Sequence, residues 1–266
     1  MLLHGLTATR RYVVMGSRLL ERRGCRLVAY DARGHGESTA APAVETYEYA
    51  DLVPDLRAVL DRLEIERAVL VGSSMGAATA LAFALEAPQR VAAIVQATPA
   101  YAGVPDDDPA KGAEWKALAD GLERSGVDGF MEAFEPWVED RWRDSVLRLT
   151  RQRLERHRDP QAVASALRVV PWSVPFEGLD ALERVEAPTL VVGSRDEADP
   201  GHPLAVAESY VERLPDAELA VEEPGRAPLA WRGAQLSRTI ADFLERRAPD
   251  FAVAPARGTS PSGDDC

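Results

Sequence analysis

The chain has 266 residues, of which 46% are hydrophobic and 28% charged, and its formal net charge is −12 at pH 7. This length is enough for one sizeable core plus an insertion, and the negative charge argues against nucleic acid or an anionic membrane as a partner. The two cysteines, Cys25 and Cys266, provide no disulfide framework and no metal-ligand spacing, and no long apolar run or signal-peptide pattern occurs, so we expect a cytoplasmic protein.

Short apolar runs alternate with helical patterns over the first hundred residues, which is typical of a parallel sheet covered on both faces. The hydrophobic spacing predicts, in chain order, the end of a strand at residues 1–3, a helix over 10–22, a buried strand over 25–30, an amphipathic helix over 48–63, a strand from 69, a helix to Glu86 and a strand over 91–97. Pro54 lies inside the 48–63 pattern, and we expect the helix to start or kink there.

The strand from residue 69 ends in Gly72-Ser-Ser-Met-Gly76, a G-x-S-x-G pattern that leads directly into small helical residues. This is the pattern of a nucleophile elbow, in which a tight strand-to-helix turn exposes the central serine. Ser74 is therefore the candidate nucleophile. The N–H of Met75 and the positive end of the helix dipole would face a developing oxyanion.

Residues 100–186 have helical patterns and no strand pattern, and they carry four of the five tryptophans: Trp115, Trp137, Trp142 and Trp172. A helical insertion between two strands of a parallel sheet predicts a cap over the strand ends, where such sheets bind ligands. The remaining chain predicts a strand over 189–193, an acidic loop over 194–203, a helix over 204–214, a strand over 218–222, a closing helix to Arg247 and a disordered tail over 248–266.

The ordered set of motifs resembles the α/β-hydrolase fold superfamily, especially its capped, cofactor-free esterases and lactonases. The set comprises His4-Gly5 after a strand, R-G-H-G-E-S at 33–38, G-x-S-x-G at 72–76 and G-x-x-D-x-x-x-P at 193–200. The resemblance implies an oxyanion hole formed by the N–H groups of Leu6 and Met75, and Asp196 as the acid that orients the catalytic imidazole, with Asp199 as a nearby alternative. It also implies that the 33–38 motif forms a structural turn. By the same resemblance, strands that normally precede the oxyanion strand are missing. Our interpretation is that the start of the sequence is misassigned.

The family places its catalytic histidine after the last strand, where this chain has Gly225-Arg226-Ala227. Arg226 keeps its proton at all physiological pH values and cannot accept one from Ser74. Of the four histidines, His202 in the acidic loop is the favoured relocated base. His157, surrounded by arginines, is expected on a solvated face of the cap, His35 in the structural turn, and His4 as a brace of the oxyanion loop.

We therefore expect an α/β-hydrolase core over 1–99 and 187–247 with a helical cap over 100–186. The leading hypothesis is serine-dependent hydrolysis of a carboxylic ester, lactone or thioester on a small-molecule substrate, without a metal or organic cofactor. The alternatives are a non-hydrolytic ligand-binding or regulatory protein in which Arg226 anchors an anion, and a cofactor-independent lyase or peroxidase-type enzyme that uses the same serine.

Overall fold

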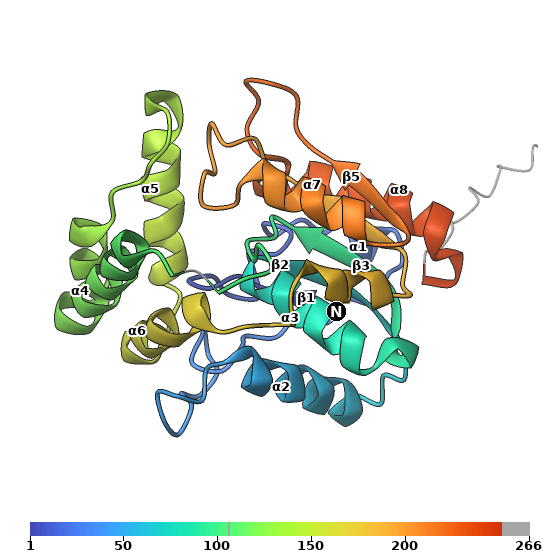
Figure 1. The fold of residues 1–266 in the computed structure, drawn as a ribbon, viewed down its shortest axis with the longest axis horizontal. Coiled ribbons are helices and arrows are strands. Elements are labelled where there is room, and N and C mark those ends of the chain that lie inside the picture. Colours follow the sequence, from blue (N-terminus) through green and yellow to red (C-terminus); the bar gives the residue numbers. More distant parts are fainter. Residues whose placement is uncertain (106, 252–266) are drawn as a thin grey trace, which may run out of the picture.

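A computed structural model describes residues 1–105 and 107–251 of the chain (Figure 1). Within these residues five parallel strands form one sheet in the order β1-β2-β3-β4-β5. Their bounds are Leu2–Leu3, Ala68–Ser73, Val91–Ala97, Thr189–Val192 and Ala217–Ala220. This arrangement confirms the expected mostly parallel α/β sheet.

The sheet is buried on both faces because its apolar side chains alternate between two core clusters. On β2, Leu70 belongs to one cluster while Val69 and Val71 belong to the other, as the two-residue period of a strand requires. The first cluster includes apolar side chains from α2 (Tyr49–Arg62), α3 (Met75–Glu86) and α7 (Leu204–Arg213). The second includes side chains from α1 (Leu19–Arg22) and α8 (Gly233–Arg247). The fold is therefore doubly wound, with helices on both faces.

Two local expectations for the first sixty residues are wrong, and so is the alternative that the next helix starts at Pro54. Residues 10–16 form turns, and only Leu19–Arg22 are helical, so the predicted 10–22 helix is mostly absent. The predicted strand over 25–30 is reduced to a single bridge between Ala29 and Leu2. Helix α2 begins at Tyr49 and contains Pro54, because a capping box between Glu48 and Asp51 fixes the start.

The segment between β3 and β4 is helical, as expected. It contains α4 (Pro109–Ala133), α5 (Asp140–Leu154), α6 (Pro160–Val169) and the short 3₁₀ helices η2 (Val170–Trp172) and η3 (Leu179–Arg184). Side chains from α4, α5 and α6 form a core cluster of their own, whereas Leu182 of η3 packs in the main core. Figure 1 shows α4, α5 and α6 on one side of the sheet domain. We refer to α4–α6 as the helical segment.

Short 3₁₀ turns complete the described chain: η1 (Pro88–Arg90), η4 (Leu229–Trp231) and η5 (Pro249–Phe251). The disordered tail was expected over 248–266, and this is wrong for its first residues, because Ala248 is buried and 249–251 form η5. The rest of that range, 252–266, lies outside the described residues. No helix within 1–105 or 107–251 combines the length and apolar character that crossing a membrane would require.

Candidate active site

Ser74 occupies the apex of the turn between β2 and α3. Its φ of 50° lies in the left-handed region, where a residue with a side chain is strained, and its N–H donates to the Ala97 carbonyl over 3.0 Å. A Cβ on Gly72 would lie 2.2 Å from the Gly76 carbonyl oxygen, so the turn closes only with glycine there. These features are those of a nucleophile elbow.

The loop after β1 lies directly against the elbow. A Cβ built on Gly5 would lie 3.3 Å from the Ser74 Cβ, and a Cβ on Gly76 would collide with the Leu3 carbonyl at 2.3 Å. His4 fixes this loop, because its Nε2 accepts from the Ala32 N–H over 2.9 Å and its Nδ1 lies 2.8 Å from the Gly5 carbonyl. Leu6 follows in the same loop, and Met75 is the first residue of α3, whose first-turn N–H groups have no intrahelical acceptor.

His202 lies beside Ser74 although the two residues are 128 positions apart in the chain. The distance from His202 Nε2 to Ser74 Oγ is 2.9 Å, and the distance from His202 Nδ1 to Asp199 Oδ1 is 2.8 Å. The side chains of His202 and Asp199 are 24% and 18% exposed, so solvent and a ligand can reach them. Serine hydroxyl, imidazole and carboxylate are therefore connected in one hydrogen-bonded row.

Asp196, the acid that the family spacing indicates, lies elsewhere. Its Oδ1 accepts the Leu204 N–H over 2.9 Å, at the first residue of α7. A carboxylate in this position satisfies a helix-start N–H and interacts favourably with the helix dipole. The structure thus brings Asp199, the alternative acid, to His202 and uses Asp196 to begin the helix.

A single turn explains why Asp199 and His202 meet. The sequence Asp199-Pro-Gly-His202 is a β-turn sequence, and the His202 N–H donates to the Asp199 carbonyl over 3.1 Å. The first and fourth residues of such a turn are neighbours, so their side chains pair locally. This turn sequence was the signal that distinguishes Asp199 from Asp196.

Glu222, which the sequence patterns did not indicate, holds the start of the acidic loop. It is 9% exposed, and its Oε1 accepts the Arg195 N–H over 2.6 Å and the Ser194 hydroxyl over 3.3 Å. Its Oε2 accepts the Leu229 N–H over 3.3 Å. The buried carboxylate of Glu222 therefore connects the loop after β4 to the loop after β5.

The surroundings of His202 favour its protonated form. Burial acts to lower the pKa of His202, but the charge of Asp199 and its hydrogen bond to the ring outweigh burial, so the pKa lies above the usual value for histidine. Arg153, a cation on α5, opposes this rise. A raised pKa makes the imidazole a stronger base, which suits it to accept a proton from a serine hydroxyl.

The other three histidines form a buried row, which corrects the expectation that His157 lies on a solvated face. The ring centroids of His4 and His35 are 5.1 Å apart, and those of His35 and His157 are 5.5 Å apart. His157 is 8% exposed because the chain after α5 folds back, where the Gly36 N–H donates to its Nδ1 and its Nε2 lies 3.1 Å from the Thr7 carbonyl.

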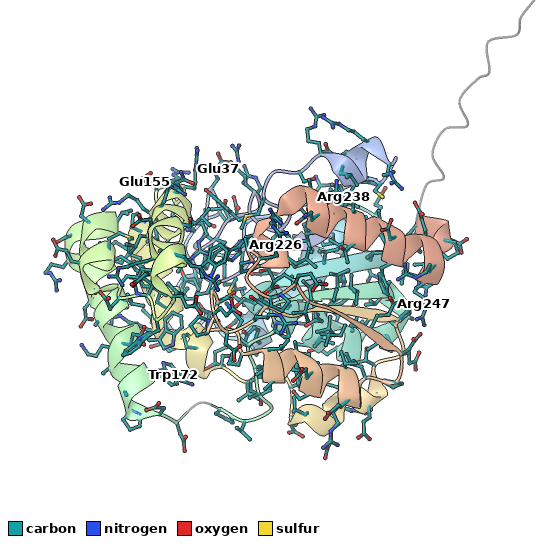
Figure 2. All side chains as sticks on the ribbon, turned by 90° about the horizontal axis from the view of Figure 1, so that it is seen from above. Glu37, Glu155, Trp172, Arg226, Arg238 and Arg247 are labelled. Atoms are coloured by element: carbon teal, nitrogen blue, oxygen red, sulfur yellow. The ribbon has the colours of Figure 1, made fainter. Side chains whose placement is uncertain are left out.

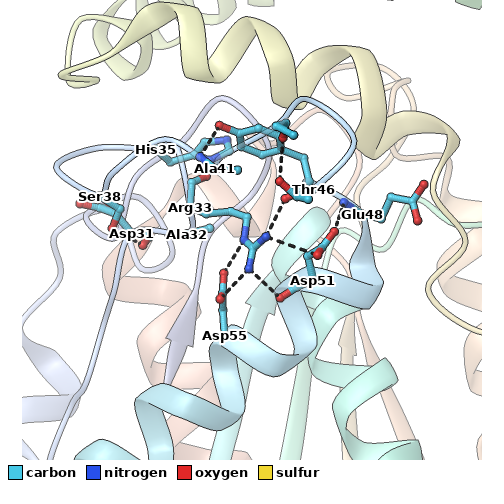
Figure 3. A network of polar contacts seen from close by, with 12 residues as sticks. Asp31, Ala32, Arg33, His35, Ser38, Ala41, Thr46, Glu48, Asp51 and Asp55 are labelled. Carbon is cyan, nitrogen blue, oxygen red and sulfur yellow. Dashed lines mark hydrogen bonds and ion pairs between the residues drawn. The ribbon is translucent and has the colours of Figure 1, made fainter.

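The R-G-H-G-E-S turn is anchored to α2 by Arg33 (Figure 3). Arg33 donates two hydrogen bonds to the Asp55 carboxylate, over 2.7 and 2.8 Å, and a third to the Thr46 carbonyl. These bonds and the charge of Asp55 raise the pKa of Arg33. The turn therefore has the structural role that the family resemblance implies, and it carries His35 to the buried histidine row.

Arg226 is exposed and lies in a different place from Ser74. It lines an open groove of about 650 Å³ together with residues of the loop after β5 and of α8, among them Arg232 and Arg238. Figure 2 shows Arg226 and Arg238 beside α8. All residues that line this groove fall within 221–242, so the groove includes none of Ser74, Asp199 and His202.

Comparison with known proteins identifies the family. The family model described as the alpha/beta hydrolase fold matches residues 1–232. The chain therefore belongs to the α/β-hydrolase fold family.

Individual relatives within this family carry several activities in their names. The chain is 27% identical over 234 residues to a protein from Synechocystis sp. named as a candidate non-heme chloroperoxidase, covering 84% of this chain and 82% of that protein. It is 31% identical over 227 residues to a 2-hydroxy-6-oxononadienedioate/2-hydroxy-6-oxononatrienedioate hydrolase from Paraburkholderia phymatum, covering 83% and 77%. A solved esterase from Thermogutta terrifontis superposes with a TM-score of 0.72 at 23% identity, covering 92% and 88%, which supports the fold.

Proposed function

We propose that the protein hydrolyses a carboxylic ester, lactone or thioester, with Ser74 as nucleophile, His202 as general base and Asp199 as the acid that orients the imidazole. One observation carries the proposal: His202 lies 2.9 Å from the Ser74 hydroxyl and 2.8 Å from the Asp199 carboxylate. The hydrolase name of a relative 31% identical to this chain supports the reaction class. The helical segment, within the range 100–186, would act as the cap over this site.

The reaction follows the two half-reactions of a serine hydrolase. His202 Nε2 takes the proton from Ser74 as its Oγ attacks the carbonyl carbon, and the negative charge moves to the carbonyl oxygen. The Leu6 and Met75 N–H groups donate hydrogen bonds to that oxygen. The imidazolium then protonates the departing alcohol or thiol, which leaves an acyl-serine. In the second half, His202 activates a water molecule that releases the acid and restores Ser74.

Asp199 acts on the imidazole rather than on the substrate. Its carboxylate accepts the Nδ1–H of His202, which leaves Nε2 free to accept the serine proton. It also stabilises the imidazolium that forms in each half-reaction. In this proposal Asp196 starts helix α7 and takes no part in proton transfer.

Turnover of 4-nitrophenyl butyrate by wild type, Ser74→Ala, His202→Gln and the double variant tests the proposal. Because the members of a triad act as a unit, we expect each single variant to lose about 10³-fold or more in kcat/KM, and the double variant to lose little beyond that. A fluorophosphonate probe should label wild type at Ser74, detected by intact mass. Full activity of His202→Gln would place the base elsewhere. Folded wild type that neither turns over esters nor is labelled would favour the ligand-binding alternative.

A further inference from the structure

Helix α5 lies beside the candidate site, because both of its ends are attached to loops of that site. At its start the Glu139 N–H donates to the Glu197 carbonyl over 3.2 Å, and Arg141 forms an ion pair with Glu197 at 2.6 Å. After its end, His157 contacts Thr7, the residue after Leu6. Figure 1 shows α5 between α4 and the sheet domain. One side of α5 therefore faces the proposed catalytic residues.

Arg153, in the last turn of α5, lies on this inward side. Its guanidinium interacts electrostatically with Asp199, and it also acts on His202 and His157. Trp142 lies eleven residues earlier, which is close to three helical turns, so it shares a face with Arg153. The Nε of Arg153 and the Nε1 of Trp142 are both buried, and neither has a hydrogen-bond partner within the described part of the chain.

Arg153 differs from the other four arginines of α5. Arg141, Arg143 and Arg151 each form an ion pair with a carboxylate on the surface, and Arg148 is exposed to solvent and contacts the Ser145 hydroxyl. Arg153 forms no ion pair within 4 Å among residues 1–105 and 107–251, and its one side-chain hydrogen bond is a 3.3 Å contact from Nη2 to the Thr150 hydroxyl. Asp199, the nearby carboxylate, already accepts from His202 at 2.8 Å.

A guanidinium in this position is suited to bind an anion. Arg153 as a whole is half-buried, but its Nε is fully buried, and a buried donor without an acceptor is costly. Burial also lowers the pKa of Arg153, although the charge of Asp199 opposes this effect. Arginine binds carboxylates through two parallel hydrogen bonds, and its Nε is one of the two donors used in that geometry. The free Nε of Arg153 is therefore a donor without an acceptor, beside the residues that would carry out the reaction.

We propose that Arg153 binds a carboxylate of the substrate, so that the site selects esters or lactones that carry a free carboxylate in addition to the bond that is cleaved. This inference rests on the proposed function, because it names the substrate class of the same site. In this proposal the arginine that binds an anion is Arg153 rather than Arg226.

The test compares 4-nitrophenyl hexanoate with mono-4-nitrophenyl adipate, which has the same acyl chain with a terminal carboxylate. The measured quantity is the ratio of kcat/KM for the anionic ester to kcat/KM for the neutral ester. We expect a ratio above one for wild type and a decrease of about 10- to 100-fold for Arg153→Met, the usual range for a lost charge-assisted hydrogen bond. Arg153→Lys should retain part of the preference. Arg153 also acts on the pKa of His202, but that effect changes kcat/KM for both esters alike, so the ratio isolates the interaction with the carboxylate.

Arg148→Met is the matched control, because Arg148 is an exposed arginine of the same helix whose side chain contacts Ser145. It should leave the ratio unchanged. An equal loss on both esters in Arg153→Met would mean that Arg153 only positions the helix or Asp199, and an unchanged ratio would mean that it does not meet the substrate. Either result overturns the inference while Ser74-dependent turnover of the neutral ester keeps the proposed function.

A binding measurement keeps the inference testable if wild type hydrolyses neither ester. Isothermal titration of wild type and Arg153→Met with monoethyl adipate, and with diethyl adipate as the uncharged comparison, reports the carboxylate interaction without catalysis. We expect wild type to bind the monoester more tightly than the diester, and Arg153→Met to lose this difference. Equal binding of the two compounds by wild type would refute the carboxylate site.

Discussion

At the scale of single residues, the site contains two aspartates three positions apart with different partners. Asp199 contacts the His202 ring, whereas Asp196 accepts the Leu204 N–H at the start of α7. Since both are acidic residues of the same loop, substituting them separately compares two carboxylates with matched chemistry. The contrast decides which of them assists proton transfer.

We expect Asp199→Asn to lower kcat by about 10³- to 10⁴-fold, because an asparagine amide offers His202 a donor and favours the wrong tautomer. Asp196→Asn should lower kcat less than about tenfold, since an asparagine oxygen still accepts the Leu204 N–H. The measurement is steady-state turnover of 4-nitrophenyl butyrate, with circular dichroism to establish folding. A larger loss for Asp196→Asn would reverse the assignment of the acid.

The pKa of His202 predicts the pH dependence of the reaction. Catalysis needs the neutral imidazole, and the folded pKa lies above the usual value of about 6.5, so activity should decrease as the pH falls through a midpoint above that value. In Asp199→Asn the negative charge beside His202 is gone, so burial lowers the pKa of His202. The acid limb of kcat/KM for Asp199→Asn should therefore move to lower pH while the plateau falls. An acid limb at the same pH in both proteins would contradict the role of Asp199.

The residue types of the site were predictable, but their pairing depended on local geometry. Ser74 followed from G-x-S-x-G, because small residues on both sides are a steric requirement of the turn. His202 followed by elimination of the other histidines. The acid was ambiguous because spacing along the chain favours Asp196, and only the turn from Asp199 to His202 makes the contact. The position of Arg153 beside the site was not predictable, because it depends on how α5 packs against the loops of the site.

At the scale of elements, the strands with strong partners were the predictable ones. Strands β2 and β3 match their predicted ranges because each is buried between two neighbours. Residues 25–30 have an equally apolar pattern but make one bridge to β1, so the pattern alone overstated the strand. His157 was misplaced for a similar reason. The arginines around it predict a solvent-exposed side chain, but the His157 ring is buried and contacts the backbone of Gly36 and Thr7.

The loop between β4 and α7 depends on a carboxylate from the end of β5. Glu222→Gln replaces an acceptor of the Arg195 N–H and the Ser194 hydroxyl with a group that has one neutral acceptor and two donors. We expect it to destabilise the protein by about 1–3 kcal/mol and to reduce kcat/KM, because the loop carries both Asp199 and His202. Thermal unfolding and ester turnover measure the two effects.

Glu223→Gln is the control for this prediction, because Glu223 is the adjacent acid and is exposed. It should change neither the unfolding temperature nor the activity measurably. Similar effects for the two variants would show that net charge, rather than the hydrogen bonds of Glu222, is responsible.

At the scale of the whole molecule, the buried histidine row makes stability depend on pH. Burial lowers the pKa of His4 to about 4 and also lowers the pKa values of His35 and His157. The folded state therefore binds fewer protons than the unfolded state below about pH 6.5, so the free energy of unfolding decreases as the pH falls. The three histidines act in the same direction, so their contributions to this decrease between pH 7.5 and 5.5 add.

Urea unfolding at pH 7.5 and 5.5, for wild type and His157→Asn, measures this effect. The variant should be less stable at pH 7.5 because it loses the contacts with Gly36 and Thr7. Its decrease between the two pH values should be smaller than that of wild type, because one titrating group is gone. Comparing the two proteins removes the contribution of other groups, among them the Met1 amine, whose pKa burial lowers to about 5. An equal decrease in both proteins would exclude His157 as a contributor.

Because one turn joins Asp199 to His202, the acid and base of the proposed proton relay form a single local unit of the chain. Acid and base arise from four consecutive residues, so their spacing is independent of the segment after β5, where Pro224, Gly225 and Arg226 are exposed. The family resemblance would place the base in that segment, where a change would affect catalysis. Here it is available for insertion, and a flexible peptide or a second domain joined between Gly225 and Arg226 would leave the distance between acid and base intact. With His202 as the proposed base, this exposed position is available as an attachment point.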